Sequence, residues 1–340
     1  NNIRQVNNME INFKRHNFIK DANTLSKFDT KNLKLEKGYL VNIDKNHMGE
    51  VVSPIVNTLE FPKCTCSWSA ITNEIDTIEV FIQIRVGEVW SDFFTYGLWG
   101  LGKDNFYYNQ ECDCAKIDVD EVIAKNGKAN AFRFKCELYN NAKLDLVCVS
   151  LKLDDYKTHV NCKYLPSTLQ YDVPKLNQNM VPVIGHEMCS ATTSAMLLKF
   201  MGMDFSDKDS EFEHRYVAKL VADPGHNSPT YGNWVYNTAA MSSFGFTSYV
   251  ARVYSWEELK YHLAKIGPVG LSIKGDTGLY KTGGHLLVVK GYKVLDGITY
   301  VTCNDPNINS RFGEGLFVEY DYPLETFMSF SRGVIYVIKK

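Results

Sequence analysis

The amino-acid sequence predicts a multidomain protein in which an N-terminal all-β sandwich precedes an α+β domain. The chain has 340 residues, 45% of them hydrophobic, which is enough apolar material for two cores rather than one. A hydrophobic period of two dominates residues 8–165, whereas helical patterns first occur after residue 172. We therefore expect two domains, 8–165 and 172–340, joined by a linker near residues 160–175.

Charge and hydropathy exclude several classes of protein. Lys and Arg number 37 against 39 Asp and Glu, which leaves a formal charge of -2, and no basic stripe stands out. Nucleic acid is therefore not an expected partner. No stretch approaches the roughly 18 consecutive apolar residues of a transmembrane helix, so no membrane span is expected.

The N-terminal half has the pattern of half-buried antiparallel strands. Residues 78–86 alternate apolar and polar side chains, and similar alternation recurs over 132–138 and 144–148. Turn signals such as Asn126-Gly127 and Asn140-Asn141 separate such runs. Several short strands with turns between them are typical of an antiparallel sandwich.

The C-terminal half begins with helical signals and ends with strand signals. Small polar residues from Cys189 onward precede an apolar run that stops at Gly202, which predicts a helix starting at or beside Cys189. Ser255 and Glu258 form a capping box, and Gly267 closes the helix that follows it. Runs at 269–273, 286–289, 298–301 and 333–338 read as strands, so an α+β domain is expected.

The nine cysteines read mainly as core residues. Their number is odd, and the chain is too long to need disulfide staples. A zinc site of Cys64, Cys66, Cys112 and Cys114 is an alternative, although a one-residue gap differs from the usual knuckle spacing. The thiol content favours a reducing compartment such as the cytoplasm. At Asn1 there is neither an initiator Met nor a secretory signal pattern, and secretion after removal of a leader stays open.

Three residues have the local context that thiol catalysis requires. Cys189 lies at a predicted helix N-terminus, where the helix dipole favours a thiolate. His285 opens a strand after two glycines and fits the role of base, and Asp305 ends the next strand, where it can orient the imidazole if the strands are antiparallel. Each has a structural alternative: a packed helix residue, a buried strand histidine and a turn opener, respectively.

Four segments around these residues resemble the papain-like cysteine peptidases of the bacteriocin-processing type, family thirty-nine, and in particular their stand-alone bacterial branch. The segments are 173–178, 188–197, 284–292 and 304–306. The likeness extends through 232–237 to the carboxyl end. It also reaches the N-terminal half at 67–70 and 90–99, so it covers most of the chain.

The resemblance implies a papain-like fold for 172–340 and a role for each matching residue. Cys189 would be the nucleophile, His285 the general base and then acid, and Asp305 the orienting residue. Gln178 matches the glutamine that helps to hold the oxyanion, with a surface loop position as its alternative. Ala191 departs from the family, in which proline is frequent at that position. No metal or organic cofactor is implied.

Other residues compete for a functional role. His186 precedes the nucleophile by three residues and reads as pocket lining or surface, and His262 reads as a packed histidine of the capped helix. Residues 232–234 line a groove or form a turn. The aromatic residues between 90 and 99 form a sandwich core or, alternatively, a platform for sugars.

The expected function is that of a cysteine peptidase or amidohydrolase which cleaves a peptide or amide bond through a thioester. Its partner would be a peptide or protein substrate. Two alternatives stay open: an acyltransferase of the transglutaminase type with the same triad, and a catalytically idle protein whose sandwich binds a glycan, a peptide or another cell-surface ligand. Export-coupled leader processing is not expected, because the chain has neither membrane spans nor a phosphate-binding loop.

Overall fold

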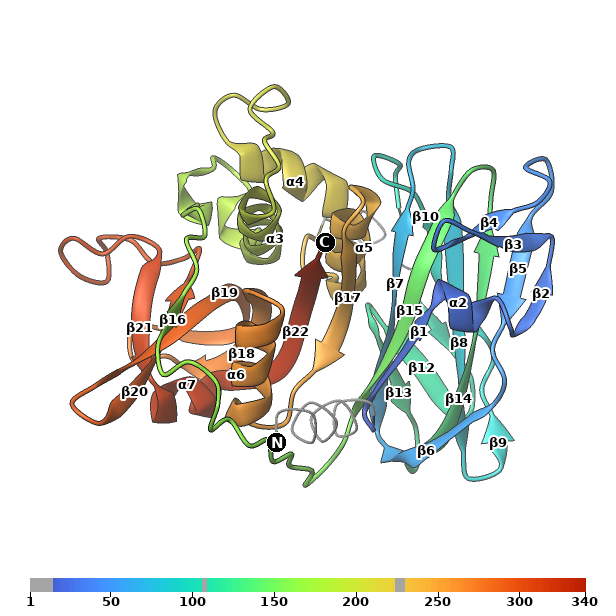
Figure 1. Ribbon diagram of the computed structural model, residues 1–340, viewed down its shortest axis with the longest axis horizontal. Coiled ribbons are helices and arrows are strands. Elements are labelled where there is room, and N and C mark those ends of the chain that lie inside the picture. Colours follow the sequence, from blue (N-terminus) through green and yellow to red (C-terminus); the bar gives the residue numbers. More distant parts are fainter. Residues whose placement is uncertain (1–14, 106–108, 224–229) are drawn as a thin grey trace. The chain divides into compact units, whose positions relative to one another are not determined.

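The computed structural model describes residues 15–105, 109–223 and 230–340, which fall into two compact units (Figure 1). The sandwich unit comprises the described parts of 14–156 and 222–252, and the second unit comprises 157–221 and 253–340. Sequence analysis assigned 222–252 to the C-terminal domain. In the structure the described part of this segment, 222–223 and 230–252, groups with the sandwich unit.

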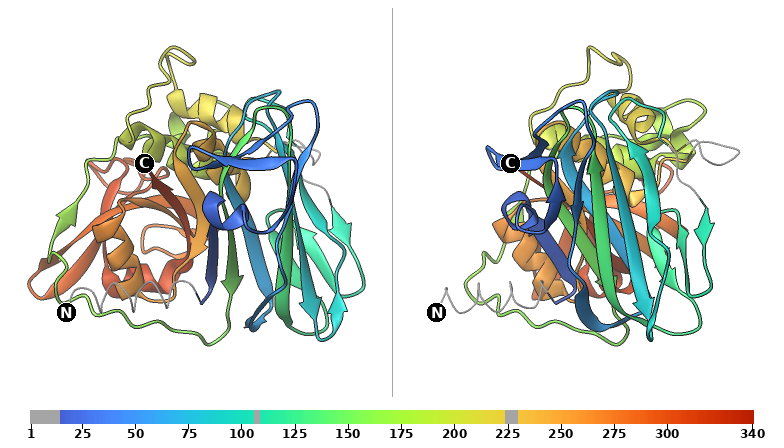
Figure 2. Two further views of the ribbon diagram at one scale, coloured as in Figure 1. Left: turned by 45° about the vertical axis from the view of Figure 1, so that its right-hand side comes forward. Right: turned by 90° about the vertical axis from the view of Figure 1, so that its right-hand side faces the viewer.

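The sandwich unit contains two antiparallel sheets (Figure 2). The first has the strand order β11 (Gln110–Glu111), β12 (Ala115–Asp118), β13 (Glu121–Ala124), β7 (Lys63–Ile71), β15 (Lys143–Lys152), β4 (Tyr39–Asn42) and β3 (Leu33–Glu36), with β1 (Asn17–Asp21) also on β15. The second has the order β10 (Phe94–Trp99), β8 (Ile78–Val86), β14 (Ala129–Leu138), β5 (Gly49–Val52) and β2 (Asp29–Lys31), with β6 (Val56–Phe61) on β14 and β9 (Val89–Trp90) on β8.

Aromatic contacts join the inner faces of the two sheets. Phe18 of β1 meets Phe132 of β14 edge to face at 5.1 Å between ring centroids, and Trp68 of β7 meets Tyr96 of β10 at 5.8 Å. The alternation predicted for β8 and β14 is confirmed, since their even-numbered apolar side chains are buried apart from Val86, which is half-buried at the end of β8. Asn126 lies in the left-handed region that a tight turn requires, with φ 55°.

Strand β7 is buried on both faces, which explains why the segment 222–252 belongs to this unit. Its outer face carries hydroxyls rather than apolar groups. Ser67 accepts a hydrogen bond from the backbone N–H of Val250 (2.9 Å), and Ser69 accepts one from that of Ser248 (3.1 Å). Both donors lie on β17 (Thr247–Arg252), and the hydroxyl of Ser242, on α5 (Trp234–Ser243), accepts from the N–H of Ala70. With α5 and the short α2 (Ala22–Leu25), the unit is not purely β.

The second unit is an α+β assembly. Its antiparallel sheet has the order β22 (Ser331–Lys339), β18 (Val269–Asp276), β19 (Lys281–Leu295), β20 (Ile298–Asn304) and β21 (Glu319–Pro323), with β16 (Leu169–Gln170) on β19. Its helices are α3 (Cys189–Phe200), α4 (Glu213–Val221), α6 (Trp256–Lys265) and α7 (Leu324–Phe330), with 3₁₀ turns η1 (Gln178–Met180) and η2 (Gly185–Glu187) before α3. None of the described helices has the length and apolar character needed to cross a membrane.

Candidate active site

Cys189 is the first residue of α3, as the sequence predicted. The helix starts after η2, and its first turn is closed by the N–H of Thr192 on the carbonyl of Met188 at 2.9 Å. The Cys189 side chain is half-buried, whereas every residue from Ser190 to Leu198 is buried. Packing on all sides therefore fixes the helix, and the cysteine lies at its accessible end.

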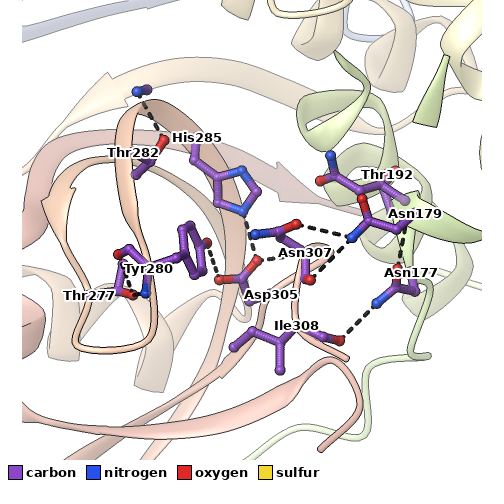
Figure 3. A network of polar contacts seen from close by, with 12 residues as sticks. Asn177, Asn179, Thr192, Thr277, Tyr280, Thr282, His285, Asp305, Asn307 and Ile308 are labelled. Atoms are coloured by element: carbon purple, nitrogen blue, oxygen red, sulfur yellow. Dashed lines mark hydrogen bonds and ion pairs between the residues drawn. The ribbon is translucent and has the colours of Figure 1, made fainter. Parts of the chain in front are cut away.

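His285 lies on β19, and Asp305 directly follows the neighbouring strand β20. Strands β19 and β20 are antiparallel, as the prediction required, and Val288 pairs with Asn304. This register places residue 287 across from residue 305, so His285 lies two residues further along β19, within reach of Asp305. The Nε2 atom of His285 lies 2.7 Å from Oδ1 of Asp305 (Figure 3). The imidazole is 7% exposed and the carboxylate is fully buried.

The surroundings of Cys189 and His285 favour their charged forms. Burial raises the pKa of the Cys189 thiol, but the charge of His285, its hydrogen bond, and the N–H groups of Leu286 and Ser190 outweigh burial, so that the pKa lies below its ordinary value. Burial lowers the pKa of His285, but Asp305 and Cys189 outweigh it, and the net shift is upward. The two shifts together favour a thiolate beside an imidazolium.

Tyr280 is a member of the site that sequence reasoning missed. Its hydroxyl donates to Oδ2 of Asp305 at 2.5 Å, and its ring meets the His285 ring edge-on at 5.8 Å and 90° (Figure 3). Thr277 holds the loop, because its hydroxyl accepts from the N–H of Tyr280 at 3.1 Å. The N–H of Asn307 donates to Oδ1 of Asp305 at 2.9 Å. Nothing in the local pattern around residue 280 distinguishes this tyrosine from a packed one.

Gln178 is buried on η1 and is tied to the turn that precedes the cysteine. Its Nε2 donates to the carbonyl of Gly185 at 2.9 Å, and the same carbonyl accepts from the N–H of Met188 at 3.4 Å. A Cβ atom on Gly185 would lie 2.3 Å from the backbone oxygen of Gln178, so only glycine fits there. The N–H of Gln178 donates to the carbonyl of Pro306 at 2.9 Å, which also joins η1 to the loop after Asp305.

Asparagine side chains, also missed from the sequence, fasten these two loops together. Asn177 Nδ2 donates to the carbonyl of Ile308 at 2.8 Å, and Asn179 Nδ2 donates to Oδ1 of Asn307 at 3.0 Å (Figure 3). Asn304 Nδ2 donates to the carbonyl of Val173 at 3.0 Å. The loop that carries Gln178 and the loop that carries Asp305 thus hold each other.

The competing histidines lie apart from this arrangement. The side chain of His186 on η2 is 72% exposed and lies 3.5 Å from Glu187. His262 is buried in α6, as predicted for a packed histidine. In the sandwich unit Asn233 caps α5 and Trp234 is buried, so residues 232–234 form a helix start.

Several of the aromatic residues and two of the four cysteines discussed for the sandwich unit are buried in its core. Phe94, Tyr96 and Trp99 are buried, and cations lie over the half-buried rings: Arg85 over Trp90 at 5.5 Å and Arg133 over Phe93 at 5.3 Å. Cys64 and Cys66 are buried, whereas Cys112 and Cys114 are half-buried. Over the described residues, no group of three or more His, Cys, Asp or Glu side chains could hold a metal ion.

A known protein family matches the part of the chain that carries the candidate site. Residues 170–328 match the Peptidase_C39 like family. The match identifies a papain-like cysteine peptidase of the C39 type, and all four residues Gln178, Cys189, His285 and Asp305 lie within it. No curated protein is significantly similar to the chain.

Solved structures with detectable likeness are distant. A digestive procathepsin L 3 of Tenebrio molitor larval midgut has a TM-score of 0.31 and 10% identity over 56% of this chain and 75% of its own. A structure from work on the mite allergens Blo t 1 and Der p 1 has a TM-score of 0.30 and 11% identity over 55% and 73%. The C-terminal CBM6 of LamC from Zobellia galactanivorans has a TM-score of 0.24 and 8% identity over 39% and 98%.

Proposed function

We propose that this C39-like cysteine peptidase hydrolyses a peptide or amide bond through a thioester, with Cys189, His285 and Asp305 as its triad. The observation that carries the proposal is the pair of opposed pKa shifts on Cys189 and His285, together with the 2.7 Å contact between His285 and Asp305. A helix N-terminus, an imidazolium and a buried carboxylate are the surroundings that a nucleophilic thiolate needs.

The role of His285 in the reaction depends on which of its two ring nitrogens is already hydrogen-bonded to Asp305. Nε2 is bonded to Asp305, so Nδ1 is the nitrogen that exchanges a proton at the thiol. The sulfur of Cys189 attacks the carbonyl carbon, and the C–N bond breaks as His285 gives its proton to the leaving amine. A water molecule then loses a proton to His285 and attacks the thioester, which releases the carboxylic acid and restores Cys189.

We assign to Gln178 the role of donating a hydrogen bond to the oxyanion, together with the backbone N–H of Cys189. One N–H of the Gln178 amide is bonded to Gly185, and an amide carries a second hydrogen that stays available for a developing oxyanion. The bond to Gly185 holds the amide in one orientation before substrate binds. Removal of a single donor of this kind costs on the order of 10²-fold or more in kcat.

The first test of the proposal is the pH dependence of iodoacetamide labelling at each cysteine, read by peptide mass spectrometry on the full chain. We expect Cys189 to react fastest at about pH 6, well below the ~8.5 of an unperturbed thiol. His285→Ala should slow Cys189 at that pH and leave Cys162 unchanged. His186→Ala is the matched control, since that histidine is exposed and should not alter the profile.

Hydrolysis is tested separately with a library of peptides analysed by mass spectrometry. We expect cleavage products that vanish in Cys189→Ala and persist in Cys162→Ser. If Cys189 reacts no faster than the buried cysteines, the triad is not assembled and the proposal fails. If Cys189 is reactive but amine acceptors take up the acyl group in place of water, the reaction is acyl transfer.

A further inference from the structure

Two cysteines of the sandwich unit lie close together in one tight turn. Strands β11 and β12 form a hairpin in which Glu111 pairs with Lys116, and the N–H of Cys112 donates to the carbonyl of Ala115 at 2.9 Å. Asp113 and Cys114 occupy the two turn positions. The Sγ atoms of Cys112 and Cys114 lie 4.0 Å apart, and both side chains are half-buried.

The other cysteines have different surroundings. Five of them are fully buried, and burial raises the pKa of every one: Cys64, Cys66, Cys136, Cys148 and Cys303. Cys162 is half-buried against the carbonyl oxygens of Val160 and Glu257. Cys112 and Cys114 therefore combine contact between two sulfurs with access to solvent, as a dithiol site requires.

Hydrogen bonds of Lys125 hold the turn in place. The Lys125 ammonium donates to the carbonyl of Cys112 at 3.1 Å and to Glu111 at 2.5 Å, and the Lys125 N–H donates to the carbonyl of Cys114 at 2.8 Å. Burial, followed by the charge and hydrogen bond of Cys112, raises the pKa of Cys114. The raised pKa disfavours the Cys114 thiolate, so Cys114 is not assigned as the first nucleophile.

We propose that Cys112 and Cys114 form a site for thiol–disulfide exchange with small-molecule disulfides, independent of the peptidase reaction. Cys112 attacks one sulfur of the disulfide RSSR, releases one thiolate and forms a mixed disulfide. Cys114 then loses its proton to solvent and attacks the sulfur of Cys112, which releases the second thiolate. In total, the dithiol is oxidised by two electrons and RSSR is reduced to two RSH.

Because Cys112 and Cys114 lie in one short turn, the disulfide between them would be easy to reduce. The two sulfurs must approach from 4.0 Å to about 2.05 Å, which requires rotation of the side chains within the short turn. A bridge between residues two apart encloses almost no chain, so it adds little stability to the fold. Exposed bridges of this kind are readily reduced. The site should therefore cycle between dithiol and disulfide.

The test uses the native full chain, incubated with glutathione disulfide, then alkylated and digested for mass spectrometry. We expect the peptide with Cys112 and Cys114 to become two mass units lighter and to escape alkylation, and dithiothreitol to reverse the change. In Cys114→Ser, Cys112 should retain one glutathione that the wild-type chain expels. Cys162→Ser is the matched control and should behave as wild type.

Two results would overturn the assignment. One is a wild-type peptide in which both cysteines carry glutathione, because the two sulfurs then do not react with each other. The other is a peptide in which both remain fully alkylatable at equilibrium while Cys189 is modified. The readout is independent of proteolysis, so loss of this site and failure of the proposed peptidase activity are separately visible.

Discussion

Two buried carboxylates, one in each unit, show how the same group acquires different roles. Asp305 in the second unit is fully buried and lies among donors: Nε2 of His285, the hydroxyl of Tyr280 and the N–H of Asn307. Asp120 in the sandwich unit is 6% exposed and accepts from the N–H of Trp234 at 2.6 Å, at the start of α5. Burial raises the pKa of Asp120 to about 7, and the Trp234 N–H opposes that shift only in part.

The difference teaches that burial alone does not make a carboxylate catalytic. A cationic partner within hydrogen-bond distance offsets part of the cost of burying a carboxylate, and His285 lies at that distance from Asp305. Without one, burial favours the neutral form, as for Asp120. A buried acid that only accepts from a helix N–H is therefore a structural element, whereas a buried acid bonded to a histidine beside a half-buried cysteine is a candidate functional one.

The largest expected effect is the loss of the triad carboxylate. Asp305→Ala should lower kcat for peptide hydrolysis by about 10²–10⁴-fold, because His285 loses both the acceptor that orients it and the charge that raises its pKa. The alkaline limit of Cys189 activation should move to lower pH for the same reason. Steady-state kinetics over a range of pH measures both.

The matched control is Asp120→Asn, which alters a buried acid of the other unit and should leave kcat unchanged. A kcat that is equal in Asp305→Ala and wild type would mean that the two carboxylates do not differ in the way described here.

The second effect concerns stability and follows from the raised pKa of Asp120. An acid whose folded pKa of about 7 exceeds its unfolded value near 3.9 makes the folded state bind protons more tightly. The contribution of Asp120 to the free energy of unfolding is thus most favourable below about pH 4. This contribution is lost as pH rises from about 4 to 7. The total loss is up to roughly 4 kcal/mol.

Asp120→Asn removes that dependence while keeping an acceptor for Trp234. We expect the variant to gain stability relative to wild type between pH 5 and pH 8, measured as the free energy of unfolding in urea at both values. A stability difference that is constant across this range would show that Asp120 does not titrate there.

The smallest expected effect comes from the tyrosine that positions Asp305. Tyr280→Phe keeps the edge-on ring contact with His285 but leaves Oδ2 of a fully buried carboxylate without its donor. Such a loss costs on the order of 1–3 kcal/mol, and we expect kcat to fall about tenfold with KM little changed. Tyr300→Phe, on the half-buried part of β20, is the control and should behave as wild type.

If Tyr280→Phe changes KM rather than kcat, the tyrosine contacts substrate and does not position the carboxylate. If neither parameter changes while the protein stays folded, the hydrogen bond to Asp305 has no part in the reaction.

Much of the site could be predicted because each of its parts has a local signature. Small polar residues before an apolar run predicted that α3 begins at Cys189, and the capping box predicted α6; both are confirmed. The antiparallel pairing of β19 and β20, on which the approach of His285 and Asp305 depends, is confirmed as well. Tyr280 and the asparagines of the two loops escaped prediction, since their partners lie on segments far away in the sequence.

The sequence by itself determined where strands and helices form, and which residue types stand at their ends. Alternation, capping and turn preferences act between neighbours along the chain, so they can be read without the fold. Only the tertiary structure decided that α5 and β17 pack on β7, that Asp120 accepts a hydrogen bond from the first N–H of α5, and that Tyr280 and Asn307 surround Asp305. These depend on packing between distant segments, and packing sets the burial and charge that shift each pKa.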